Sequence, residues 1–207
     1  MKKLLFMLVL CLPVAGFADD GALASVLARA RHDGAGKFQY RETRLLELAA
    51  APWEAEGYML TGADGSLVKL QLQPSRVIMA ISDEEMYYWD PLQNQRHRMP
   101  LDYGGEAAEQ IVLFRAILQG HSEDFQNSYD FAAQIDDKRW SLRMTPKAGQ
   151  GDAAATIEIS GDDAAGSRII SMRRRDGEAT EYHISRLPER QADNLSIPAL
   201  LREATGD

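Results

Sequence analysis

Most of the chain alternates between apolar and polar residues with a period of two, which is typical of β-strands with one buried face. The clearest rows cover residues 68–72, 77–81 and 140–144, where every second side chain is large and apolar. Asp64-Gly65 and Asp176-Gly177 each separate two such rows, and Asp-Gly in this position indicates a two-residue hairpin. About eleven strands are predicted, at residues 38–48, 57–61, 68–72, 77–81, 86–89, 96–99, 129–133, 140–144, 157–159, 168–175 and 178–185.

Three segments depart from this period and predict helices. Residues 21–32 are apolar at helical spacing, and residues 197–201 are expected to form a last helical turn. Residues 104–119 are apolar around most of a helical wheel, which indicates a helix buried on more than one side. Strands in hairpins with few helices predict an α+β fold, in which an antiparallel sheet carries its helices on one face.

The N-terminus predicts a cleavable secretory signal. Lys2 and Lys3 precede an apolar stretch at residues 4–14, and small residues then stand at Gly16 and Ala18. A membrane anchor would need about 20 apolar residues, and this run is shorter. We therefore expect residues 1–18 to be removed and residues 19–207 to form a single domain. The one cysteine, Cys11, lies inside the signal, so no disulfide is expected in the mature protein.

Charge and motifs restrict the function classes. Removal of residues 1–18 takes away Lys2 and Lys3 and lowers the formal charge from −8 to −10, which argues against nucleic-acid binding. The chain has no G-x-S-x-G nucleophile motif and no paired histidine spacing that would suit zinc. We expect no metal, no cofactor and no enzymatic activity. The four histidines stand singly and are expected at the surface: His32, His97, His121 and His183.

The unusual feature of the sequence is therefore its rows of large apolar side chains. The predicted helices are few and short for so many strands, so a broad curved sheet would keep an apolar cavity. Six methionines remain after removal of the signal, and this flexible side chain suits a surface that accepts variable apolar shapes. Ile111, Phe114 and Leu118 share one face of the central helix and are expected to close the cavity as a lid. The candidate cavity and lid residues are Leu70, Leu72, Met79, Ile81, Tyr88, Ile111, Phe114, Leu118, Trp140 and Met144.

Several segments stand in a characteristic order along residues 23–186: Phe38-Gln-Tyr-Arg-Glu-Thr-Arg44, Gly57, Pro74, Leu113-Phe-Arg-Ala-Ile-Leu-Gln-Gly120 with Phe125 and Tyr129, and Trp140-Ser-Leu-Arg-Met-Thr-Pro-Lys147. Together these segments resemble the periplasmic outer-membrane lipoprotein carriers, the LolA-like family, and especially a divergent branch of it. In that family's carriers an Arg-Pro pair follows the first hairpin strand, whereas this chain has Thr61-Gly-Ala-Asp-Gly65 there.

The resemblance implies an incomplete β-barrel, with short helices as a lid over a cavity for acyl chains, in the periplasm of a Gram-negative cell. It implies a carrier, expected to be a monomer, for lipid or lipoprotein cargo moving from the inner towards the outer membrane. Its expected partners are an inner-membrane exporter and an outer-membrane acceptor. The alternative is a non-catalytic sensor or regulatory binding module of the same fold, which would contact another envelope protein.

Overall fold

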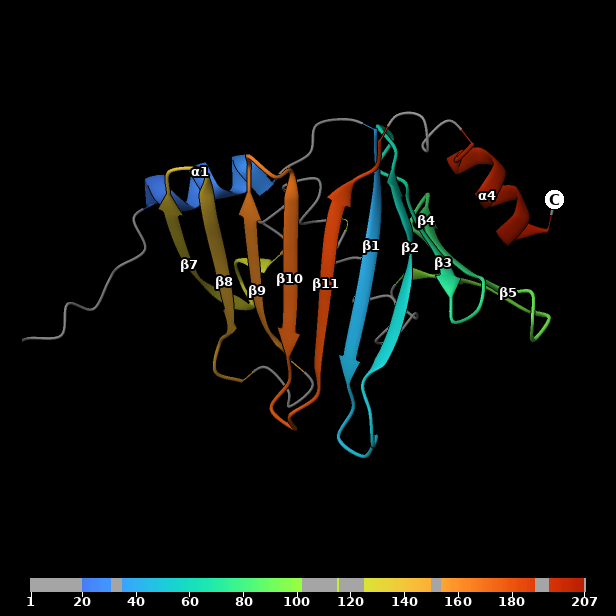
Figure 1. Cartoon of the computed structure of the whole chain (residues 1–207), viewed down its shortest axis with the longest axis horizontal. Coiled ribbons are helices and arrows are strands. Elements are labelled where there is room, and N and C mark those ends of the chain that lie inside the picture. Colours follow the sequence, from blue (N-terminus) through green and yellow to red (C-terminus); the bar gives the residue numbers. More distant parts are fainter. Residues whose placement is uncertain are drawn as a thin grey trace, which may run out of the picture.

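A computed structural model describes residues 20–30, 35–101, 115, 125–149, 154–188 and 194–206. Eleven strands form one antiparallel sheet in the order β6-β5-β4-β3-β2-β1-β11-β10-β9-β8-β7 (Figure 1). The strands are β1 (Gly36–Leu45), β2 (Trp53–Thr61), β3 (Leu67–Gln73), β4 (Val77–Ser82), β5 (Glu85–Asp90), β6 (Gln95–Pro100), β7 (Tyr129–Asp136), β8 (Arg139–Pro146), β9 (Thr156–Asp162), β10 (Ser167–Arg173) and β11 (Ala179–Arg186). The two described helices are α1 (Asp20–Ala30) and α4 (Ile197–Thr205).

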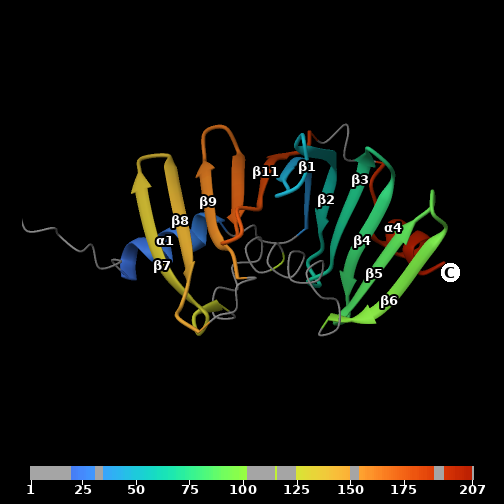
Figure 2. The same ribbon diagram turned by 90° about the horizontal axis from the view of Figure 1, so that it is seen from below.

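The sheet consists of two meanders joined at its centre. Strands β1 to β6 follow one another on one side, strands β7 to β11 on the other, and β1 pairs with β11 between them. In this central pair, Tyr40 lies opposite Ile184 and Glu42 lies opposite Tyr182. The sheet is curved, and β6 and β7 are its two edges and do not pair with each other (Figure 2). The α+β fold and the incomplete barrel expected from the sequence are confirmed.

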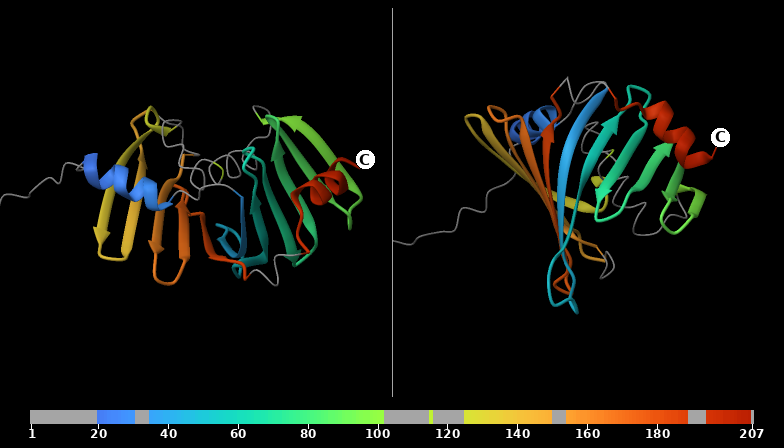
Figure 3. Two further views of the ribbon diagram at one scale, coloured as in Figure 1. Left: turned by 90° about the horizontal axis from the view of Figure 1, so that it is seen from above. Right: turned by 45° about the vertical axis from the view of Figure 1, so that its right-hand side comes forward.

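One face of the sheet, which we call the inner face, bears a continuous apolar cluster from β5 to β8. Met86 of β5, Met59 of β2, Tyr182 of β11 and Leu142 of β8 all belong to this cluster and are buried. Because side chains alternate along a strand, residues two apart in each of these strands share the inner face. The sheet is curved, so its β7 to β10 half and its β2 to β6 half are inclined to each other (Figure 3).

Helix α1 covers the inner face at the β7 and β8 end. Val26 and Ala30 are buried in the same cluster as Trp140 and Leu142. The Arg29 guanidinium fixes the end of the helix, since its Nη1 donates to the Asp137 carbonyl oxygen at 2.8 Å and to the Asp163 carboxylate at 3.1 Å. The helix expected at residues 21–32 is thus confirmed over residues 21–30, and residues 31 and 32 lie outside the described part.

Helix α4 packs on the opposite, outer face, against β3, β4, β5 and β6. Leu200 and Ala204 are buried there in a second cluster with Val68, Leu70 and Ile78. The expectation that the helices gather on one face is therefore wrong. The physical reason is that β3 and β4 also turn apolar side chains to the outer face, so that face needs a cover as well.

Arginines from the sheet hold α4 in place. Arg76 donates two hydrogen bonds to the Glu203 carboxylate, at 3.1 and 2.6 Å. Arg96 of β6 donates from Nε to the Ala204 carbonyl oxygen at 2.9 Å, and its guanidinium stacks on the Trp89 ring at 3.9 Å. A cation at a helix C-terminus stabilises the carbonyls that have no partner within the helix.

Hairpins form at both Asp-Gly positions, but the expected two-residue turns are wrong: the connections are residues 62–66 and 174–178. Gly65 and Gly177 both have positive φ, at 84° and 94°, which other residues adopt only with strain. The predicted signal at residues 1–18 and the predicted central helix at residues 104–119 lie outside the described part, apart from Arg115, which is helical. Neither α1 nor α4 is long and apolar enough to cross a membrane.

Candidate functional site

The inner face gathers the methionines of the chain. Six methionines follow residue 19, and every one of them belongs to the inner-face cluster or packs against it: Met59, Met79, Met86, Met99, Met144 and Met172. They come from six different strands, on both sides of the central β1–β11 pair. Methionine has a flexible, polarizable side chain that adapts to irregular apolar partners. The inner face is therefore an adaptable apolar surface that extends over most of the sheet.

The structure divides the candidate residues named from the sequence between the two faces. Met79, Ile81, Trp140 and Met144 lie in or against the inner-face cluster. Tyr88 lies opposite Met79 in the β4–β5 pairing and therefore shares its face.

Leu70 lies on the outer face, where it is buried against α4. Leu72 is 38% exposed, stands at an irregularity in the pairing of β2 with β3, and belongs to neither of the two described clusters. Ile111, Phe114 and Leu118 lie outside the described residues.

A buried ionic cluster lies at the centre of the inner face, where side chains from β1, β3 and β11 meet across β2. The Glu42 carboxylate is fully buried, and the Lys69 ammonium donates to its Oε2 at 2.5 Å. Arg44 Nε and the Tyr182 hydroxyl donate to Oε1 at 2.5 and 2.8 Å. The cluster thus satisfies the Glu42 carboxylate with two cations and one hydroxyl, inside an otherwise apolar face.

Aromatic rings surround the two cations of the cluster. The Lys69 ammonium lies 5.0 Å from the centre of the Tyr40 ring and 5.1 Å from that of Tyr182. The Arg44 guanidinium lies 4.9 Å from the centre of the Trp53 ring, near the end of β1. Aromatic faces attract cations, so these rings stabilise charges that burial would otherwise make costly.

The cluster shifts the pKa values of its members. Burial by itself would raise the pKa of Glu42, but the charges of Lys69 and Arg44, with the hydrogen bonds from Lys69 and Tyr182, outweigh it and lower the pKa. Burial lowers the pKa of Lys69, and the attraction of Glu42 opposes this shift without cancelling it. Burial, together with the negative charge of Glu42, raises the pKa of Tyr40 and of Tyr182. Glu42 is therefore ionised and both tyrosines are neutral at neutral pH.

One hydroxyl in this region has no hydrogen-bond partner among the described residues. Tyr40 is 3% exposed, and its hydroxyl oxygen is buried without a donor or acceptor beside it. Most buried polar groups in folded proteins are hydrogen-bonded, because an unmet donor costs free energy. The Tyr40 hydroxyl therefore offers a hydrogen bond that the described residues leave unused.

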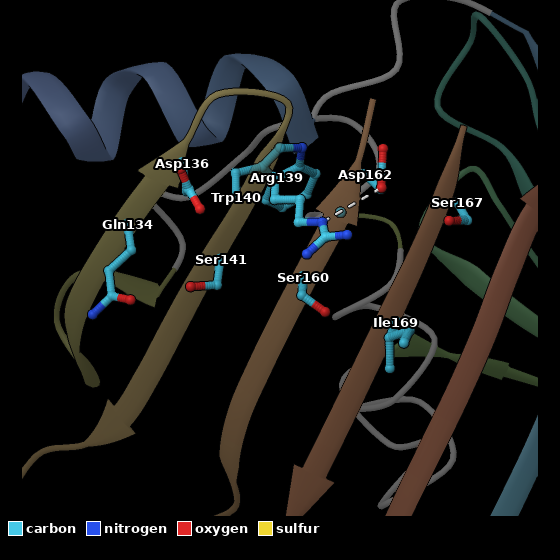
Figure 4. Close-up of a pocket in the computed structure, with 10 residues that line it drawn as sticks. Gln134, Asp136, Arg139, Trp140, Ser141, Ser160, Asp162, Ser167 and Ile169 are labelled. Atoms are coloured by element: carbon cyan, nitrogen blue, oxygen red, sulfur yellow. Dashed lines mark ion pairs between the residues drawn. The ribbon is translucent and has the colours of Figure 1, made fainter. Parts of the chain in front are cut away.

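The outer face of the β7 to β10 half carries a separate hollow of about 350 Å³ (Figure 4). The ion pair between Arg139 and Asp162, at 3.8 Å, lies across it. Gly161 belongs to its floor, and a side chain at this position would collide with the Trp140 ring on the inner face. The residues that line the hollow are Gln134, Asp136, Arg139, Trp140, Ser141, Ser160, Gly161, Asp162, Ser167 and Ile169.

Neither site resembles a catalytic or metal centre. No group of three or more histidine, cysteine, aspartate or glutamate side chains among the described residues could hold a metal ion. The ionic cluster has a carboxylate, but its hydrogen bonds come from two cations and a tyrosine rather than from a nucleophile that it could activate. The arrangement is suited to holding charge in a fixed place.

Sequence reasoning missed the ionic cluster. In the sequence, Lys69 stands between the apolar positions Val68 and Leu70 and looks solvent-facing, whereas in the structure it shares the inner face with Leu67. Glu42 follows Phe38 and Tyr40 at a spacing of two on β1. The one available signal was this position of Glu42 after two aromatic residues, and it does not reveal the partner.

No protein-family model matches the chain, and no curated protein matches it. Solved structures resemble it at low sequence identity. A LolA superfamily protein from Nitrosomonas europaea aligns with a TM-score of 0.43 and 11% identity, over 84% of this chain and 97% of that one. A putative outer membrane lipoprotein-sorting protein domain from Vibrio parahaemolyticus aligns with a TM-score of 0.45 and 10% identity, over 87% and 95%.

The MucA/MucB complex of Pseudomonas aeruginosa contains a further similar chain, with a TM-score of 0.43 and 15% identity. This alignment covers 88% of the present chain and 60% of that chain.

Proposed function

We propose that residues 19–207 form a non-catalytic carrier that binds the acyl chains of lipid or lipoprotein cargo against the inner face. The observation that carries this proposal is the placement of all six methionines after residue 19 on that one face. A protein that needs only a rigid core gains little from so many flexible side chains, because methionine specifies packing poorly. A protein that accepts acyl chains of different length and branching gains an adaptable wall.

Acyl chains suit such a wall energetically. Removing a chain from water contributes about 0.8 kcal/mol for each buried methylene. A carrier must also release its cargo, so binding by many weak apolar contacts suits a protein that receives cargo at one membrane and delivers it at another.

The proposal includes the compartment and the route. Residues 1–18 would direct export and be removed, and the carrier would then act in the periplasm. It would receive cargo from an inner-membrane exporter and deliver it to an outer-membrane acceptor. The segment resemblance to the LolA-like carriers supports this part of the proposal.

The test is to isolate the protein from the periplasm of an expressing cell, extract it with organic solvent and identify bound lipids by mass spectrometry. We expect acylated molecules in amounts comparable with the protein. Binding of a fluorescent fatty acid should then fall at least about tenfold for Met79→Asp, which places a charge on the inner face. The matched control is Ile169→Asp, a partly exposed apolar residue of the outer face, which should bind as the wild type does.

Two results would contradict the carrier function. One is a protein that yields no lipid and binds no probe. The other is a protein that leaves the periplasm with a stable protein partner and no lipid, which would favour the sensor or regulatory module.

A further inference from the structure

The ionic cluster at the centre of the inner face carries one more positive than negative charge among the described residues. Among the residues that the structure describes, Glu42 is the one carboxylate whose charge acts on Lys69 and Arg44, and each of these cations lies 2.5 Å from one of its oxygens. An excess charge at such a place is costly, because the apolar surroundings do not solvate it. A bound anion would remove this cost.

The cluster also has an unused donor beside the excess charge. The Tyr40 hydroxyl is buried and has no partner among the described residues, and the Tyr40 ring lies next to the Lys69 ammonium. A buried tyrosine hydroxyl normally finds a partner. An anionic oxygen held near the cluster would satisfy it.

The exposed fractions of the side chains indicate where such an anion would enter. The side chain of Glu42 is 0% exposed and that of Lys69 is 7% exposed, whereas that of Arg44 is 30% exposed. Arg44 is the member of the cluster that a ligand can reach from solvent. Its guanidinium is held against the Trp53 ring, so its position is fixed before binding.

From these observations we propose that the cluster anchors the head group of an acylated ligand with a single negative charge, such as the carboxylate of a fatty acid or the phosphodiester of a phospholipid. This inference rests on the proposed function, because the acyl chain would lie along the methionines of the inner face. Arg44 and the Tyr40 hydroxyl would contact the anionic oxygens. One negative charge matches the single excess positive charge, so a neutral head group would gain much less.

The experiment compares two fluorescent C18 probes that differ only in the head group, a fatty acid and its primary alcohol, at a pH where the acid is ionised. For the wild type we expect the acid to bind at least about tenfold more tightly than the alcohol, as hydrogen bonds to a charged group imply. Competition of the acid by lysophosphatidylglycerol or by oleate then distinguishes the phosphodiester from the carboxylate as the better head group.

Variants separate the anchor from the apolar wall. Arg44→Gln should reduce the preference for the acid to less than about threefold, and Tyr40→Phe should reduce it by a smaller factor. The affinity for the alcohol should change much less than that for the acid in either variant. The matched control is Arg41→Gln, which alters an exposed arginine of the same strand that pairs with Glu56 at 3.9 Å on the outer face and should keep the full preference.

The outcomes are distinguishable. Equal binding of both probes by the wild type, or an unchanged preference in Arg44→Gln, overturns the head-group anchor and leaves the carrier function in place. Failure of both probes to bind overturns the carrier function, and the anchor with it. Tyr40→Phe removes a hydroxyl that has no described partner, so we expect it to fold and to give a readable result even where Arg44→Gln is unstable.

Discussion

The Lys69 ammonium lies 2.5 Å from the Glu42 carboxylate, and both side chains are buried at the centre of an apolar face. The pair joins β3 to β1, which are separated in the sheet by β2. Burying two charges costs free energy that their attraction only partly repays. The pair is therefore sensitive to the removal of either partner, and it gives the first two predictions.

Glu42→Gln should lower the free energy of unfolding by about 3 kcal/mol, because it leaves Lys69 and Arg44 buried without a counter-charge. Urea denaturation at neutral pH measures the change. The double variant Glu42→Gln with Lys69→Met should recover much of the loss, since it removes one of the two stranded cations. A loss below about 1 kcal/mol in the single variant would mean that water solvates the cluster.

The lowered pKa of Glu42 predicts a loss of stability in acid. A carboxyl whose pKa is lower in the folded than in the unfolded state stabilises the fold above the unfolded value, here 4.5, and the stabilisation disappears as pH falls through the folded value. Lys69, whose pKa is also lowered, makes the fold less stable at neutral than at strongly alkaline pH. Urea denaturation from about pH 3 to pH 7 should therefore show a shallower acid limb for Glu42→Gln than for the wild type. Glu56→Gln, at an exposed position of the outer face, should keep the wild-type profile.

Leu200→Ala should lower the free energy of unfolding by about 2–5 kcal/mol, the cost of a cavity in a buried aliphatic cluster. Leu200 is 7% exposed and packs with Leu70 and Ile78 on the outer face. Because α4 and the inner face lie on opposite sides of the sheet, the folded variant should still bind a fluorescent fatty acid normally. Arg202→Ala, on the exposed side of the same helix, should change stability by no more than about 0.5 kcal/mol. A loss of probe binding at normal stability would argue against a separation of the two faces.

Gly161→Ala should cost about 1–3 kcal/mol, because the added methyl group would overlap the Trp140 ring. Trp140 cannot move freely, since its Nε1 donates to the Asp163 carboxylate at 3.0 Å. Thermal unfolding together with tryptophan fluorescence measures the effect. Ser160→Ala, the preceding residue with its side chain on the outer face, is the control and should remain within about 0.5 kcal/mol of the wild type. Equal stability of both variants would show that the ring has room to shift.

The strands were predictable from the sequence because a sheet with one buried face imposes a period of two on its residues. The need for a helix over the outer face was also detectable in the sequence in principle. Leu67 and Val68 are both buried, and so are Ile78 and Ile81, so β3 and β4 break the strict alternation and indicate strands buried on both faces.

The ionic cluster was not predictable from the sequence, for a physical reason. Glu42 lies 27 residues before Lys69 and 140 residues before Tyr182, and each looks like an ordinary polar residue in its own strand. Their meeting depends on the register of β1 with β11 and on the curvature of the sheet. Local patterns give the face on which a side chain lies, whereas the partner comes from the pairing of distant strands.

Each described helix covers the half of the sheet that is more distant from it along the chain, and this arrangement has a consequence for folding. Helix α1 precedes the first meander in the chain but covers β7 and β8 of the second, while α4 follows the second meander but covers β3 to β6 of the first. Each half of the sheet thus receives its cover from the far end of the polypeptide. A nascent chain would hold exposed apolar strands of its first meander until α4 is made, so we expect it to need protection by other proteins until then and to mature in one concerted step.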